Sequence, residues 1–343
     1  MYQKGVKHLC DNYGVTQVPN KYILPEPERP HDLDTTNGCI DLPVIDFAQL
    51  QGADRPQVLA SLSKACQEFG FFQLINHGVD NEAIGKMIHV SKSFFELPFE
   101  ERRRYMSPDL YAPVRCGTSF NQNKDGVFCW RDFLKLSCHP IQDFASFWPS
   151  SPLELREAVG EYSTRTRHLY KSVMEAILET LEVTNEKAIM EEGNQLMMVN
   201  YYPACPQPQL TLGLPPHSDY GLLTLLLQDQ VEGLQIQHNH KWFTVKPIPN
   251  SFVVNIGDQF EIFSNGRYKS VVHRVAVNSM SSRLSVASLH SLSVNRNVTP
   301  YPKLINDSNP RLYQDTNFAD FLNYLSSSDF KCKRFLESRK LQY

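Results

Sequence analysis

The chain has 343 residues, 41% of them hydrophobic and 21% charged, so it can bury a sizeable core and does not have the composition of a disordered protein. Its formal net charge of -3 argues against nucleic acid or an anionic membrane surface as a partner, because both favour a basic face. The eight cysteines contain no Cys-x-x-Cys pair, and no apolar run has the length of a secretory core or a membrane span, so we expect free thiols and a cytoplasmic protein.

The first part of the chain predicts an arm followed by mixed structure. Residues 1–40 are polar and proline-bearing and favour an extended N-terminal arm. Residues 41–150 are expected to form an N-terminal α+β region, with helix caps at Asp80 or Asn81 and a helix stop at Pro98. Its expected elements are the strand Leu42–Phe47, the helix Pro56–Glu68, the strand Phe71–Gly78, a helix to about Leu97 and the strand Val127–Leu136.

The middle of the chain predicts one long helix. From near Pro152 to about Leu181, apolar residues recur at helical spacing along one face. We expect the region 151–192 to be helical and to act as a spine against which a sheet packs.

From about Gln195 the pattern changes to short apolar strands between turn residues, which is typical of a sandwich or barrel. We therefore expect the region 193–295 to be an antiparallel two-sheet catalytic domain, and the region 296–343 to be a helical tail. The expected strands are 196–203, 222–229, 234–237, 241–248, 251–258, 268–277 and 283–291.

A candidate metal site lies in this strand-rich region. His217 and Asp219 are two residues apart, so at the rim of a strand their side chains point to the same side. The run Leu222–Leu227 that follows is apolar apart from Thr224 and predicts a buried strand. His273, among valines, can supply a third ligand. Two histidines and one carboxylate leave open coordination positions and suit a non-heme Fe(II) oxygenase, so we expect these three residues to be catalytic and to bind iron.

A candidate anion site follows on the next expected strand. Arg283 and Ser285 are also two apart and point to one side. A guanidinium binds a carboxylate through two parallel hydrogen bonds, and a hydroxyl can add a third. This pair suits the distal carboxylate of 2-oxoglutarate.

Other histidines offer weaker candidates. His238 and His240 are two apart, but with Asn239 between them they are better interpreted as an exposed hairpin tip. His290 lies on the same expected strand as Arg283 and is a candidate to face the site. The motifs of P-loop nucleotide binding, the nucleophile elbow, zinc proteases and dinucleotide binding do not occur.

These motifs closely resemble the plant 2-oxoglutarate/Fe(II)-dependent dioxygenases over nearly the whole chain. The resemblance is carried by Leu42–Phe47, by Ala65–Val79, by the run VNYYPACPQPQLTLGLPPHSD that ends at Asp219, and by RLSVASLHS. The segment RCGTSFNQNKDGVFCWRDFLKL resembles the downy-mildew-resistance-type and flavone synthase-like branch. The family implies a distorted double-stranded β-helix, or jelly roll, with a mainly β α+β core, a long spine helix and helical additions at both ends.

The resemblance also implies residue roles. It implies iron at His217, Asp219 and His273, and 2-oxoglutarate at Arg283 and Ser285. Asn200 and Tyr202 match positions that help to hold the co-substrate. The positions that match a substrate pocket are Phe120, Phe128, Met198, Tyr220, Leu289 and Ser291.

The family chemistry couples oxidation of 2-oxoglutarate by O2 to hydroxylation or desaturation of a small hydrophobic metabolite, with ascorbate as reductant. Flavonoid or phenolic and diterpenoid or gibberellin-type substrates are open, as is an alkaloid; Met198 and Leu289 depart from the flavonoid-acting pattern. Two alternatives are an ascorbate-dependent iron oxidase that does not use 2-oxoglutarate, and a ligand-binding barrel without catalysis. We expect a monomer.

Overall fold

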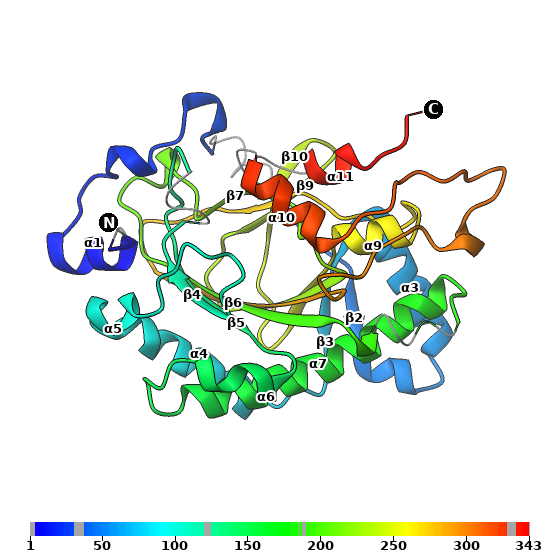
Figure 1. Cartoon of the computed structure of the whole chain (residues 1–343), viewed down its shortest axis with the longest axis horizontal. Helices are drawn as coiled ribbons and strands as arrows, with labels where there is room; N and C mark the ends of the chain where they lie inside the picture. The colour runs from blue at the N-terminus through cyan, green and yellow to red at the C-terminus, as the bar shows by residue number, and fades with distance from the viewer. Residues whose placement is uncertain are drawn as a thin grey trace.

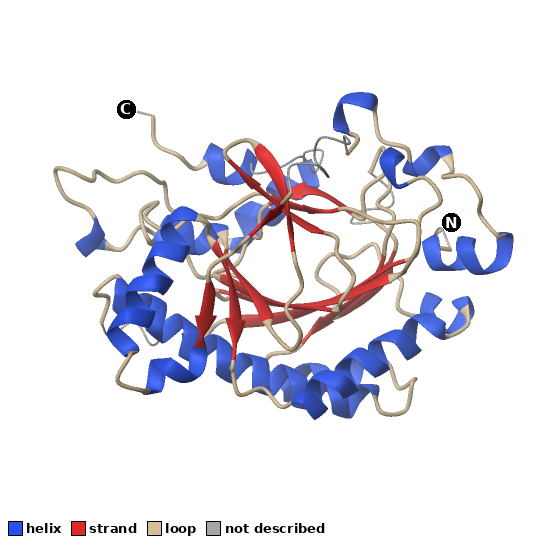
Figure 2. Ribbon diagram, turned by 180° about the vertical axis from the view of Figure 1, so that it is seen from behind, coloured by secondary structure: helices blue, strands red, loops and turns tan. Residues whose placement is uncertain are grey.

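The computed structural model describes residues 4–30, 38–119, 125–184, 186, 190–327 and 334–342. Two β-sheets face each other, and helices cover the outer side of the larger sheet (Figures 1 and 2). This is the mainly β α+β architecture that the sequence predicted.

The larger sheet has eight strands and carries most of the core. Its pairing is antiparallel except between β2 and β3. In spatial order the strands are β2 (Val44–Asp46), β3 (Phe71–Ile75), β11 (Phe252–Ile256), β8 (Leu223–Gln228), β13 (Arg283–Ser291), β6 (Asn194–Tyr202), β5 (Asp132–Ser137) and β4 (Val114–Gly117).

The smaller sheet has five strands and lies opposite. In order they are β1 (Cys39–Ile40), β10 (Lys241–Val245), β9 (Leu234–His238), β12 (His273–Val275) and β7 (Leu214–His217). Strands β9 and β10 form a hairpin in which His238 pairs with Lys241. Asn239 and His240 make its turn with positive φ angles of 49° and 61°, which confirms the predicted hairpin tip.

The predicted spine helix is α7 (Leu155–Thr180), which runs along the outer face of the larger sheet (Figure 1). Its buried Val173 and Ile177 share one apolar cluster with Val199, Leu225 and Val286 from three strands. Each such side chain contributes about 1.5–3 kcal/mol when it leaves water. The outer face of the sheet is therefore filled by helix packing, and the inner face is left for a site.

Two further helices support the same face of the sheet. Helix α3 (Arg55–Glu68) agrees with the predicted helix. Helix α4 (Asn81–Glu96) begins at Asp80, whose side chain accepts a hydrogen bond from the Glu82 amide, and it ends before Pro98, as predicted. Other α-helices in the described part of the chain are α5 (Phe99–Arg103), α6 (Ile141–Phe144), α9 (Asp258–Phe263), α10 (Phe318–Ser327) and α11 (Arg334–Ser338).

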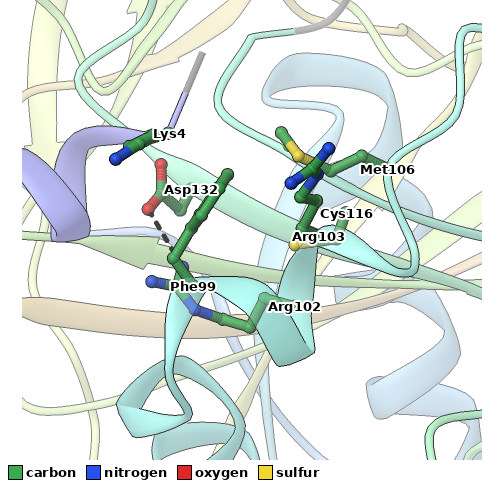
Figure 3. A pocket seen from close by; sticks show the side chains of 9 residues that line it. Lys4, Phe99, Arg102, Arg103, Met106, Cys116 and Asp132 are labelled. Atoms are coloured by element: carbon green, nitrogen blue, oxygen red, sulfur yellow. Dashed lines mark ion pairs between the residues drawn. The ribbon is translucent and has the colours of Figure 1, made fainter. Parts of the chain in front are cut away.

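The N-terminal segment is not the extended arm that was predicted, because it contains helix α1 (Val6–Tyr13). The buried carboxylate of Asp132 accepts hydrogen bonds from the backbone amides of Val6 and Lys7 at 2.8 and 3.0 Å, and so caps the start of this helix. Gly5 has φ +86°, and a Cβ there would lie 2.7 Å from Asp132 Oδ1. Figure 3 shows Asp132 in a small cavity beside Arg102, with which it forms an ion pair.

Several predicted strands are shorter than expected, and the differences are largest at β5 and β12. Residues 127–131 are not part of β5, because Trp130 turns into an apolar cluster with Val6 and Tyr22 and its indole donates to the Pro203 carbonyl. Before β12, Ser270 donates its amide to Glu261 of α9 rather than to a neighbouring strand. In both segments, contacts with residues outside the sheet replace strand pairing. Among the described residues, no helix has the length and apolar character needed to cross a membrane.

Candidate active site

Two strands of the smaller sheet bring the predicted metal-binding residues together. His217 ends β7 and His273 begins β12, and the two are cross-strand partners with ring centroids 4.1 Å apart. Asp219 follows two residues after His217, and its Oδ1 lies 3.8 Å from His217 Nε2 and 3.7 Å from His273 Nε2. One ion with bonds of about 2.0–2.2 Å can reach ligand atoms up to about 4 Å apart. The three side chains could therefore hold one metal ion.

Hydrogen bonds orient each of these side chains. Nδ1 of His217 lies 2.9 Å from the Pro215 carbonyl and Nδ1 of His273 lies 3.2 Å from the Val271 carbonyl, so both rings donate through Nδ1 and keep Nε2 as an acceptor. Asp219 Oδ2 accepts from Thr224 and Asn255, which leaves Oδ1 facing the histidines.

The electrostatics of the cluster favour the protonation states in which His217 and Asp219 can bind a metal ion. Burial and the neighbouring His273 lower the pKa of His217 to about 3, against the opposing effect of Asp219. Burial on its own would raise the pKa of Asp219, but the two histidines and the hydrogen bonds from Asn255 and Thr224 lower it below its usual value. A neutral imidazole next to an ionised carboxylate is the donor set that a divalent cation needs.

Thr224 and Asn255 are functional candidates that the sequence analysis missed. Each is a polar residue in an apolar strand, β8 or β11, and each is buried. A polar side chain inside an otherwise apolar run was the available signal, since buried polar groups need a partner.

Arg283 and Ser285 lie on the inner face of the larger sheet and are both buried. The Arg283 guanidinium donates through Nη2 to Gln228 at 2.9 Å and through Nε to the Val231 carbonyl at 3.2 Å. Its Nη1 is buried and has no hydrogen-bond partner among the described residues. An orphaned guanidinium donor beside a hydroxyl fits a carboxylate, as 2-oxoglutarate would supply.

The other two predicted co-substrate residues are on the neighbouring strand. Asn200 pairs with Ser285, and Tyr202 pairs with Arg283, between β6 and β13. The Arg283 guanidinium carbon lies 5.2 Å from the ring centroid of Tyr202. The structure thus brings these four residues into one patch.

The predicted substrate residues separate into groups. Met198 and Leu289 are half-buried and point to the inner face of the larger sheet. Ser291 is two residues beyond Leu289 on β13, so its side chain points to the same face. Tyr220 follows Asp219 and stacks on Phe321 of α10, with ring centroids 4.1 Å apart.

The remaining candidates lie elsewhere. Phe128 packs against Tyr22 of the N-terminal segment. Phe120 lies outside the described residues. The expectation for His290 was wrong: residues 283 and 290 differ by an odd number, so His290 points to the outer face, where it stacks on Tyr170 of α7.

Two family models match the chain. The 2OG-Fe(II) oxygenase superfamily matches residues 193–291, and the N-terminal model of the non-haem dioxygenases in morphine synthesis matches residues 42–151. The chain is 40% identical over 330 residues to Protein DMR6-LIKE OXYGENASE 2 of Arabidopsis thaliana, covering 95% of each chain. The chain belongs to the 2OG-Fe(II) oxygenase superfamily.

Other comparisons support the same family. The chain is 41% identical over 323 residues to Flavanone 3-dioxygenase 2 of Oryza sativa subsp. japonica, covering 93% of each chain. The solved structure of JOX2 in complex with 2OG, Fe and JA matches with a TM-score of 0.88 at 33% identity, covering 98% of each chain. The fold is therefore the predicted jelly roll, and the protein is a 2-oxoglutarate- and Fe(II)-dependent dioxygenase. One rice relative is named chloroplastic, so the cytoplasmic location stays a prediction, as do the region boundaries.

Proposed function

We propose that this dioxygenase hydroxylates or desaturates a small hydrophobic plant metabolite of phenolic or diterpenoid type. In this proposal His217, Asp219 and His273 hold Fe(II), and Arg283 and Ser285 hold the distal carboxylate of 2-oxoglutarate. The observation that supports it best is an oriented triad, in which Asp219 Oδ1 faces Nε2 of His217 and Nε2 of His273, together with a buried guanidinium whose Nη1 has no hydrogen-bond partner in the described part of the chain.

Bound iron and 2-oxoglutarate supply the oxidising chemistry. The residues of the chain bind and orient. The Pro215 and Val271 carbonyls hold the two imidazoles, Asn255 and Thr224 hold the carboxylate, and the guanidinium fixes one end of the co-substrate. Met198 and Leu289 offer apolar surface on the same face of the sheet, which suits a flat or polycyclic apolar substrate and keeps water away.

The test measures succinate formed from 2-oxoglutarate by protein loaded anaerobically with Fe(II) and then exposed to O2, with ascorbate as reductant. Flavonoids, simple phenolics, gibberellin precursors and other diterpenoids are the candidate substrates. We expect one class to raise succinate formation in the wild type and not in the Arg283→Ala variant. Oxidation of a substrate with no succinate would favour the ascorbate-dependent oxidase, and bound iron with no 2-oxoglutarate binding would refute the co-substrate site.

A further inference from the structure

Helix α9 contributes a buried carboxylate just outside the metal site. The helix closely follows β11 in the chain (yellow in Figure 1), and its first residue, Asp258, is 3% exposed. One carboxylate oxygen, Oδ2, accepts a hydrogen bond from the Ser218 hydroxyl at 3.1 Å. The other, Oδ1, accepts one from the Ser270 hydroxyl at 2.6 Å. A carboxylate loses hydration when it is buried, and hydrogen bonds to both of its oxygens offset part of that loss.

The two hydroxyls belong to the two segments that carry the metal-binding residues. Ser218 lies in the sequence between the histidine that ends β7 and the aspartate that follows it. Ser270 lies three residues before His273 and next to Val271, whose carbonyl orients the His273 ring. A single side chain, that of Asp258, therefore connects the segment with two of the ligands to the segment with the third.

Strand pairing alone does not fix the spacing of these segments. Strand β12 has three residues, and its register against β7 shifts between His273 and Val275. Asp219 lies beyond the end of β7, in the loop that follows. The backbone carbonyl of Asp219 accepts a hydrogen bond from the Asp258 amide at 2.8 Å. Asp258 thus holds this loop through its backbone as well as through its side chain.

The connection also joins the two sheets. Strand β11 belongs to the larger sheet and carries Asn255, the donor to the Asp219 carboxylate, and Asp258 follows three residues later. The two histidines come from the smaller sheet. The metal site therefore lies where the sheets meet, and Asp258 ties the ligand-bearing ends of the smaller sheet to the end of β11.

We propose that Asp258 is a positioning residue of the metal site. By accepting from Ser218 and Ser270 at once, it keeps the two ligand-bearing segments at the separation that one ion requires, before the ion binds. This inference rests on the proposed function, because it takes the three metal ligands from it.

The first test is the affinity of the Asp258→Asn variant for Mn(II), measured by calorimetry without 2-oxoglutarate. Asparagine has nearly the same size but only one acceptor oxygen, so it can accept from one of the two hydroxyls and not from both. We expect Mn(II) to bind roughly 10-fold to 100-fold more weakly than to the wild type, as when other partners that orient metal ligands are removed. Thermal unfolding of the metal-free variant shows separately that it is folded.

The serine variants Ser218→Ala and Ser270→Ala distinguish a bridge from two independent contacts. Each variant breaks the connection at one end, so each should weaken Mn(II) binding by roughly 10-fold. Because a bridge is already broken in either single variant, the double variant should bind no more than about 3-fold more weakly than the weaker single variant. Independent contacts would multiply to roughly 100-fold. This series also tests the proposal if Asp258→Asn does not fold.

Glu261 provides a matched control, because it is a second buried carboxylate of α9. It is 3% exposed, and it accepts from the Ser270 amide at 2.6 Å and from the Tyr313 hydroxyl at 2.7 Å. These bonds tie the segment before β12 to the C-terminal part of the chain. Glu261→Gln should therefore lower the melting temperature, because a buried hydrogen bond is lost, while the affinity for Mn(II) stays within about 3-fold of the wild type.

Each result supports or overturns the proposal. Unchanged affinity for Mn(II) in Asp258→Asn overturns it, even if the melting temperature falls, because the role of Asp258 is then structural. Equal losses of affinity in Asp258→Asn and Glu261→Gln overturn it too, since they show a general effect of α9. Multiplying effects of the two serine variants replace the bridge by two separate contacts. A wild-type protein that does not bind Mn(II) refutes the proposed function instead, before any variant is compared.

Discussion

Asn255 donates a hydrogen bond to one carboxylate oxygen of Asp219 and thereby orients the other oxygen toward the two histidines. Its Nδ2 donates to Asp219 Oδ2 at 2.8 Å, and the Thr224 hydroxyl donates to the same atom at 2.6 Å. The other oxygen, Oδ1, is the one that faces both histidines. Two neighbouring strands, β8 and β11, thus set the direction of a side chain on the loop after β7.

Asn255→Ala should weaken metal binding by roughly 10-fold to 100-fold, since the partners that orient a ligand contribute about that much. The carboxylate keeps its charge but can rotate away from the histidines. Calorimetric titration with Mn(II) measures the effect, and Thr224→Val should act in the same direction. Asn194→Ala is the control, because it removes an asparagine of the same sheet whose side chain donates to the Leu292 carbonyl and not to Asp219. Unchanged affinity in both site variants would show that the carboxylate does not depend on this support.

Arg283→Lys should raise the dissociation constant of 2-oxoglutarate by roughly 10-fold or more, even though the charge is kept. An ammonium cannot reproduce the planar array in which Nη2 and Nε bond to Gln228 and Val231 while Nη1 remains for a ligand. Anaerobic calorimetry measures 2-oxoglutarate, and Mn(II) binding without it should stay within about 2-fold. An equal loss of metal affinity would place Arg283 in the metal site instead.

Gly257→Ala should destabilise the fold by roughly 1–3 kcal/mol and weaken metal binding. A Cβ at Gly257 would lie 2.1 Å from the Gly221 carbonyl oxygen and 3.1 Å from that of Asp219, so the loop that carries Asp219 must move. Gly85→Ala is the matched control, because Gly85 is an exposed residue inside α4 with no atom within 4 Å of the added group. That change should raise stability by about 0.5–1 kcal/mol. Thermal unfolding measures the stability of both variants. A melting temperature of Gly257→Ala equal to that of the wild type would contradict the crowding at Gly257.

Spacing along single strands predicted much of this site, and contacts between distant segments account for the rest. The two-residue spacings of His217 with Asp219 and of Arg283 with Ser285 suffice to place each pair on one side, because side chains alternate along a strand. The same rule, applied to residues 283 and 290, would have put His290 on the outer face. In contrast, helix α1 forms against Asp132, more than a hundred residues away, and no local pattern shows that partner.

Lys135 should make the stability of the protein rise with pH in alkaline solution. Burial, together with the nearby Arg115, lowers the pKa of Lys135 from its ordinary 10.5 to about 8, against a weaker opposing effect of Asp109. Between pH 8 and 10.5 the unfolded chain keeps the proton that the folded chain has lost, so raising the pH favours the folded state in this window.

The variant Lys135→Met removes this titration. The free energy of unfolding of the wild type minus that of the variant should therefore increase from pH 8 to pH 10, by at most about 1.4 kcal/mol per pH unit. Denaturant unfolding at pH 7, 8, 9 and 10 measures this difference. A difference that stays constant over this range would mean that Lys135 titrates alike in both states, and that its ammonium is as well accommodated by the Leu110 and Ala112 carbonyls as it is by water.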